Sequence, residues 1–153
     1  KGEKFDLVVQ KGTELGVNRF IPLVTRFADI RLRDEADASK RVTRWQRIAL
    51  EAAKQSGRAV VPEIKLPETF ESVIRENSCL LFSERQGERL NTDLKTQSAI
   101  AVVGSEGGWS DEELDQARAE GVPIVTLGGR VLRAETAAIA TAVLLQHRYG
   151  DLK

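Results

Sequence analysis

The chain has 153 residues, enough for one domain with a full hydrophobic core. Its 23 basic and 23 acidic residues cancel, and a zero net charge argues against sequence-independent binding of nucleic acid through many phosphate contacts. No apolar run approaches the roughly 18 residues that a membrane-spanning helix needs. The single cysteine, Cys79, excludes an internal disulfide and favours a cytoplasmic location.

The first part of the chain predicts two amphipathic helices and a short strand. Apolar residues at helical spacing predict a helix over 5–15, and the apolar segment 20–24 predicts a strand, irregular or at an edge because of Pro22. A charged loop is expected over 29–40. A helix is expected over about 38–56, with an inward stripe of Val42, Trp45, Ile48 and Ala52.

The rest of the chain alternates strands with helices. In order, we expect a strand near Ile64, a helix near 68–76, a strand over 79–82, a polar loop over 84–97, a strand over 99–103, a helix from Ser110 to Gly121 with Glu113 in a capping box, a strand over 122–127 and a helix over about 134–149. This alternation predicts an α/β fold with a mostly parallel sheet, covered by helices on both faces, in one domain.

The final predicted helix has no polar face. Residues 136–145 are apolar or small on every side, whereas a surface helix normally carries one polar face. We therefore expect this helix to pack against its own core and against a partner subunit.

Two glycine-bearing segments follow two late strands: GSEGGW after 99–103 and LGGRVLRAET after 122–127. Ligands of parallel sheets bind beyond the carboxyl ends of the strands, and glycines let the backbone approach a ligand closely. Either segment alone is more simply explained as a tight turn with a helix cap. Together with Arg130, Arg133 and Glu135, they favour a binding site.

Several classes of site are excluded by missing motifs. No glycine precedes a Lys-Ser/Thr pair as in a P-loop, and neither GxGxxG nor the GxSxG of serine hydrolases occurs. The single histidine, His147, lies far from Cys79, so no Cys/His metal cluster is expected. The predicted chemistry therefore requires neither a metal ion nor histidine.

The segments GSEGGWSDEEL and LGGRVLRAETA resemble the two C-terminal signatures of the RsmE-type family, the small-subunit ribosomal RNA uridine N3-methyltransferases of the SPOUT superfamily. QKGTELGV at 10–17 and RWQRIALEAAKQSGR at 44–58 resemble the same family, so the likeness spans about residues 10–150. One position departs from it, since Ser105 stands where proline is typical. Serine leaves that loop less pre-organised.

The resemblance implies a C-terminal trefoil knot that binds S-adenosylmethionine, a homodimer formed through the knot and the final helix, and 16S ribosomal RNA of the small subunit as substrate. It also implies an N-terminal RNA-binding barrel. Because the sequence contains no methionine, we expect this barrel to precede Lys1 in the natural protein, and residues 1–153 to be the catalytic domain.

The resemblance also implies site residues. For catalysis, Arg133 is expected to stabilise a uridine anion, and Glu135 either to act as the base or to orient Arg133. Glu106 is expected to contact the methionine amine or to cap backbone N–H groups. The implied cofactor-binding residues are Phe82, Ser83, Glu84, Gly104, Glu106, Gly107, Gly108, Leu127, Gly128, Arg130, Val131, Leu132, Thr136 and Ala137.

The residues expected to contact substrate RNA are Arg26, Arg44, Gln55 and Arg58. For the basic face of the helix near 44–58, a solvated surface is an equally simple interpretation, with Glu51 pairing with Arg47. Two other functions stay open on the sequence: a knotted RNA-binding or assembly module without catalysis, and a flavodoxin-like nucleotide-binding enzyme.

Overall fold

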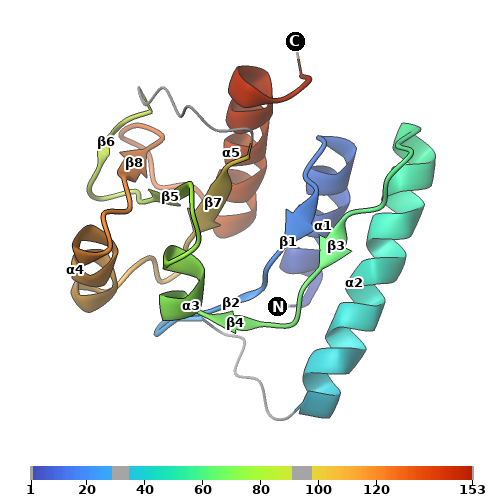
Figure 1. Ribbon diagram of the computed structural model, residues 1–153, viewed down its shortest axis with the longest axis horizontal. Coiled ribbons are helices and arrows are strands. Elements are labelled where there is room, and N and C mark those ends of the chain that lie inside the picture. The colour runs from blue at the N-terminus through green and yellow to red at the C-terminus, as the bar shows by residue number, and fades with distance from the viewer. Residues whose placement is uncertain (1, 29–34, 91–97, 153) are drawn as a thin grey trace.

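The computed structural model describes residues 2–28, 35–90 and 98–152, and all strand pairs within these residues are parallel (Figure 1). In chain order the elements are α1 (Gly2–Glu14), β1 (Arg19–Phe20), β2 (Leu23–Val24), α2 (Glu35–Ser56), β3 (Glu63–Ile64), β4 (Glu68–Thr69), α3 (Phe70–Ile74), β5 (Cys79–Phe82), β6 (Glu88–Arg89), β7 (Ile100–Val103), α4 (Asp111–Ala119), β8 (Ile124–Thr126) and α5 (Ala134–Tyr149). The predicted α/β class is confirmed.

The main sheet has the strand order β6-β8-β5-β7, and helices cover both of its faces. Alternate residues of β5 point to opposite sides. Cys79 and Leu81 pack in one cluster with buried residues of α3 and α4. Leu80 and Phe82 pack in another, against which Leu145 of α5 also lies. The central strand is buried along its whole length, as the continuous apolar sequence predicts.

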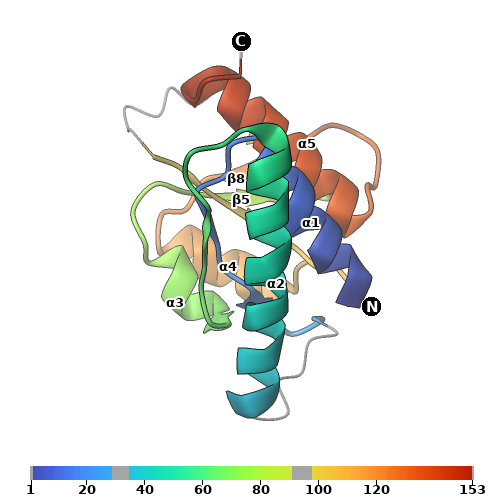
Figure 2. The ribbon, with the colours of Figure 1, turned by 90° about the vertical axis from the view of Figure 1, so that its right-hand side faces the viewer.

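A smaller layer joins α1 and α2 to four short strands. β1 pairs with β3, and β2 pairs with β4. The predicted strand over 20–24 is thus divided at residues 21 and 22, where the Pro22 carbonyl accepts a hydrogen bond from the N–H of Glu68. Trp45 is buried with Val9 of α1, as expected for a core residue. Helix α1 lies between α2 and α5 (Figure 2).

Three predicted boundaries were wrong. Helix α2 begins at Glu35, inside the predicted charged loop, because acidic side chains such as Glu35 and Asp37 favour the first turn of a helix. The remaining loop residues, 29–34, lie outside the described residues. The polar loop contains β6, and its residues 91–97 also lie outside them. Helix α3 is shorter than predicted: residues 68 and 69 form β4, Thr69 caps the start of the helix, and the helix ends at Ile74.

Candidate functional site

The carboxyl ends of three strands lie side by side in the main sheet. Phe82, the last residue of β5, pairs with Val103 of β7 on one side and with Val125 of β8 on the other. Because these strands are parallel, the segments that follow them start at one edge of the sheet. The two glycine segments therefore begin at the same edge, as the sequence predicts.

The loop after β5 crosses directly over the backbone of β8. The N–H of Ser83 donates to the carbonyl of Val125 at 2.9 Å, and the Ser83 hydroxyl accepts from the N–H groups of Arg85 and Gln86 at 3.4 Å. Gly87 has a φ of +146°, and a Cβ at this position would lie 2.8 Å from the carbonyl carbon of Val125. Only glycine allows so close an approach.

The loop after β7 is tied back to β5. The indole N–H of Trp109 donates to the carbonyl of Phe82 at 2.8 Å, and the N–H of Gly108 donates to the carbonyl of Ser105 at 2.9 Å. Gly108 has a φ of +68°, and a Cβ there would lie 2.5 Å from a carboxylate oxygen of Glu84. Glycine at this position thus lets the first two loops touch.

A turn over residues 25–28 docks on the same loop. The carboxylate of Glu113 accepts one hydrogen bond from the N–H of Ser110, completing the predicted capping box, and another from the N–H of Arg26 at 3.0 Å. The hydroxyl of Ser105 donates to the carbonyl of Phe27 at 3.1 Å. Residues far apart in sequence are therefore held together beside the loop after β7.

The loop after β8 is open. The N–H of Gly128 donates to the hydroxyl of Thr126 at 3.3 Å, and Gly128 has a φ of +114°. A Cβ on Gly128 or Gly129 would meet no heavy atom within 4 Å. Leu127 packs against the core cluster of β5 and β8, whereas Val131 is 82% exposed. This loop offers both a backbone cradle and an apolar side chain.

The two proposed catalytic residues stand at the start of α5. Arg133 is the N-cap, its carbonyl accepts from the N–H of Ala137 at 2.8 Å, and its side chain is exposed. Glu135 has a buried carboxylate oxygen, Oε2, that finds no hydrogen-bond partner in the described part of the chain. Among the described residues, no hydrogen bond or ion pair joins the side chains of Arg133 and Glu135, and the roles expected of them stay predictions.

The arrangement of three loops at one sheet edge can be compared with known families. The family model of the RNA methyltransferase domain matches residues 1–146. The chain belongs to this family. The resemblance drawn from the glycine segments is thereby confirmed.

Curated relatives of this RNA methyltransferase domain agree. A ribosomal RNA small subunit methyltransferase E from Mesomycoplasma hyopneumoniae is 35% identical over 91% of this chain and 62% of the relative. The protein of the same name from Bacillus subtilis is 34% identical over 91% of this chain and 59% of its own length. The chain thus spans about six tenths of these relatives.

Solved structures share the fold. A ribosomal RNA small subunit methyltransferase E from Neisseria gonorrhoeae, bound to S-adenosyl methionine, matches with a TM-score of 0.85 and 34% identity, covering 100% of this chain and 64% of that chain. A Legionella pneumophila protein described as a methyltransferase, in complex with the same cofactor, matches with a TM-score of 0.90 and 32% identity, covering 97% of this chain and 62% of that chain.

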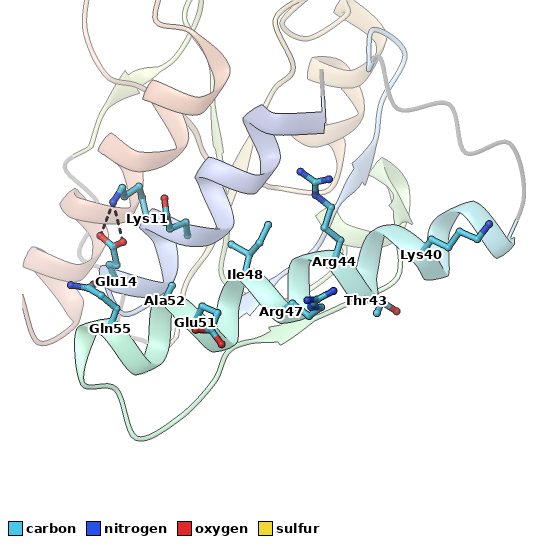
Figure 3. A pocket seen from close by; sticks show the side chains of 11 residues that line it. Lys11, Glu14, Lys40, Thr43, Arg44, Arg47, Ile48, Glu51, Ala52 and Gln55 are labelled. Carbon is cyan, nitrogen blue, oxygen red and sulfur yellow. Dashed lines mark hydrogen bonds and ion pairs between the residues drawn. The ribbon is translucent and has the colours of Figure 1, made fainter.

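The expected RNA contacts of the methyltransferase domain fall in three places. Arg44 and Gln55 line a groove between α1 and α2, together with Lys11, Lys40 and Arg47 (Figure 3). The other two residues lie elsewhere. Arg26 belongs to the turn over 25–28, which docks beside the loop after β7, and Arg58 follows α2 and contacts the end of α1.

The surroundings of these arginines differ. The carboxylate of Asp6 accepts from Arg44 Nε at 3.1 Å, and this hydrogen bond and charge raise the pKa of Arg44 above its usual value. Arg26 donates to Glu112 at 2.8 Å. Arg58 Nη1 donates to the carbonyls of Thr13 and Val17 at 2.9 and 2.7 Å, so it closes the end of α1. A contact with RNA stays a prediction for all of them.

The surroundings of Cys79 and His147 favour structural roles for both residues. Burial raises the pKa of the Cys79 thiol to about 11, which disfavours the reactive thiolate. His147 Nδ1 lies 3.1 Å from the carbonyl of Leu152 near the end of α5. Within residues 2–28, 35–90 and 98–152, no cluster of His, Cys, Asp or Glu is arranged to hold a metal ion, and no helix has the length and apolarity to cross a bilayer.

Two residues and one hydrogen bond at the site were not predicted from the sequence. Gly87 lies in the predicted polar loop, where an isolated glycine gave the only signal. Phe27 is a single aromatic residue that follows a strand end, a weak signal without knowledge of its neighbour Gly107. The tether from Glu113 to the Arg26 backbone has no signal in the sequence, because it joins segments 87 positions apart.

Proposed function

We propose that this chain is the catalytic domain of an enzyme that uses S-adenosylmethionine to methylate N3 of a uridine in 16S ribosomal RNA. The observation that carries the proposal is the meeting of three loops at one sheet edge in a member of the RNA methyltransferase domain family. The Neisseria gonorrhoeae relative, which has the same fold, was solved with this cofactor.

The residues of the three loops fit the cofactor. Open space adjoins Gly128 and Gly129, where backbone groups can contact adenine, and Leu127 and Val131 provide apolar surface for the ring. The unpaired oxygen of Glu135 provides negative charge for a cationic ligand. We propose that the cofactor is held by Phe82, Ser83, Glu84, Gly104, Glu106, Gly107, Gly108, Leu127, Gly128, Arg130, Val131, Leu132, Thr136 and Ala137.

The residues at the start of α5 act on the uracil. When bound, the cofactor supplies a sulfonium methyl group for in-line displacement, a reaction accelerated mainly by positioning. Uridine N3 carries a proton that must leave first. The Arg133 guanidinium beside the uracil oxygens favours the anion. The carboxylate of Glu135 accepts the N3 proton or orients Arg133.

The RNA-binding surface includes Arg26, Arg44, Gln55 and Arg58. Support comes from the groove between α1 and α2, which is lined by the cations Lys11, Lys40, Arg44 and Arg47 and by two carboxylates, Glu14 and Glu51. Asp6 fixes the orientation of Arg44 while leaving 63% of its side chain exposed. A pre-oriented exposed guanidinium suits a phosphate oxygen.

A knot and a homodimer complete the proposal. Strand β8 lies between β5 and β6, which are joined directly along the chain, and this order supports a threaded C-terminus. Val143 and Leu144 of α5 are 37% and 41% exposed, which supports an apolar dimer interface on this helix. We further propose that an RNA-binding barrel precedes this domain and that the enzyme acts in the cytoplasm, where ribosomes are assembled.

The test is methyl transfer to small ribosomal subunits from a strain that lacks the protein, with the modified base identified by mass spectrometry. Arg133→Ala, in the protein with its complete N-terminal region, is expected to lose at least about 100-fold in turnover while binding the cofactor normally. Wild-type activity in this variant would remove Arg133 from the mechanism. Cofactor binding by the wild type without methylation would favour an RNA-binding module. Thermal stabilisation by FMN or ATP alone would favour a flavodoxin-like enzyme.

A further inference from the structure

Phe27 is exposed beside the glycine loop that follows β7. Its exposed fraction is 48%, whereas Phe20, Phe70 and Phe82 are 7% exposed or less. Exposing a phenylalanine forgoes the free energy that its burial would contribute. Single apolar residues on a surface are common, so exposure alone does not indicate a function.

The backbone around Phe27 is fixed. The N–H of Arg26 donates to the buried carboxylate of Glu113 at 3.0 Å, and the carbonyl of Phe27 accepts from the Ser105 hydroxyl at 3.1 Å. The N–H of Ala28 closes a turn onto the carbonyl of Thr25 at 3.2 Å. The turn therefore presents an exposed ring from a backbone that is anchored on both sides of it.

Phe27 rests on the glycine loop that follows β7. A Cβ on Gly107 would lie 2.6 Å from the Cβ of Phe27 and 3.2 Å from its Cγ, so the side chain starts directly on the Gly107 backbone. The same loop begins where β7 ends, beside the ends of β5 and β8. The ring thus adjoins the edge at which the proposed cofactor-binding loops meet.

We propose that Phe27 is a stacking platform for an unpaired base of the substrate RNA, beside the uridine that accepts the methyl group. This inference rests on the proposed function. Proteins that read single-stranded RNA stack splayed bases on exposed aromatic rings, and one such contact contributes about 1–3 kcal/mol. A platform fixed before binding costs little ordering when the base docks.

The test compares three variants of the protein with its complete N-terminal region. Phe27→Ala removes the ring, Phe27→Trp keeps an aromatic surface, and Leu66→Ala removes an apolar side chain that is 59% exposed on the segment between β3 and β4. Phe27→Ala is expected to raise the Kd and KM for RNA by about 5-fold to 150-fold. Phe27→Trp and Leu66→Ala are expected to stay within about twofold of the wild type, with the cofactor Kd unchanged in all three.

A second measurement identifies the stacked base. A set of RNAs carries an abasic nucleotide at successive positions beside the target uridine. At one of these positions the wild type and Phe27→Ala should bind equally well, because the base that stacks on Phe27 is then missing. Unchanged RNA affinity of Phe27→Ala would overturn the proposal. If the free energy of unfolding also fell in that variant, the role of Phe27 would be structural. Failure of the proposed function is distinct, since wild type itself would then not methylate RNA.

Discussion

At the scale of single residues, Ser105 and its neighbouring glycines have different tasks. Proline is typical at position 105 in the family that the sequence resembles, and serine there predicts a less ordered loop. The structure compensates, because the Ser105 hydroxyl donates to Phe27, a bond that proline cannot form. Gly107 provides space for Phe27, and Gly108 combines a left-handed φ with space for Glu84.

The tasks of Gly108 can be separated by a matched pair of variants. Gly108→Ala and Gly121→Ala both place a side chain at a φ near +70°, and both are expected to lower the free energy of unfolding by about 1–2 kcal/mol. Only the Cβ at 108 also displaces a carboxylate, that of Glu84, because open space surrounds position 121. We therefore expect Gly108→Ala alone to weaken cofactor binding, by about tenfold.

Urea denaturation and calorimetric titration with S-adenosylmethionine check this pair. Wild-type cofactor affinity in both variants would mean that contact between the first two loops plays no part in binding. A weaker affinity in both would point to general destabilisation instead.

At the scale of elements, α4 does more than cover the sheet. Its capping carboxylate, Glu113, is buried and accepts from two backbone N–H groups, those of Ser110 and Arg26. The cap thus connects the loop after β7 to the turn over 25–28. The sequence predicts the half of this motif within one helix, since Ser110 and Glu113 stand at the capping-box spacing. The other half depends on tertiary packing.

Glu113→Ala leaves two N–H groups without their acceptor. We expect the free energy of unfolding to fall by about 1–3 kcal/mol. RNA affinity is expected to fall as well, because the turn that carries Phe27 loses one anchor. Glu112→Ala is the control. The Glu112 carboxylate is exposed and contacts the Arg26 guanidinium, so its removal is expected to change the free energy of unfolding little. Denaturant unfolding of both variants decides the point, and equal losses would contradict it.

Most element types were predictable from the sequence, but β4, β6 and the order of the strands in the sheet were not. Periodicity and caps gave α5 at 134–149 as the structure has it, and the apolar run 79–82 gave the buried strand β5. The sequences of strands of two to four residues do not indicate which strands pair with one another. The position of β8 between β5 and β6 depends on contacts distant in sequence, such as the approach of Gly87 to Val125. Resemblance, not periodicity, implied the roles of Arg133 and Glu135.

At the scale of the whole molecule, α5 lies at the side of the main sheet and packs on α1 and β7 (Figure 1). Among its residues only Thr141 is fully buried, although the helix has no polar face over 136–145. An isolated domain would leave apolar side chains such as Leu144 in contact with water. A second copy of the chain on this face would cover them.

Leu144→Glu places a charge on this face, where a dimer would bury it without a partner. We expect the variant to be a folded monomer under conditions in which the wild type is a dimer, as measured by size-exclusion chromatography with light scattering. The matched control is Leu66→Glu, at an exposed site on the segment between β3 and β4, which should stay dimeric. A monomeric wild type would reject the interface, and a dimeric Leu144→Glu would move it elsewhere. Because α5 also carries Glu135 and follows the loop proposed to bind the cofactor, the monomer is further expected to bind S-adenosylmethionine more weakly.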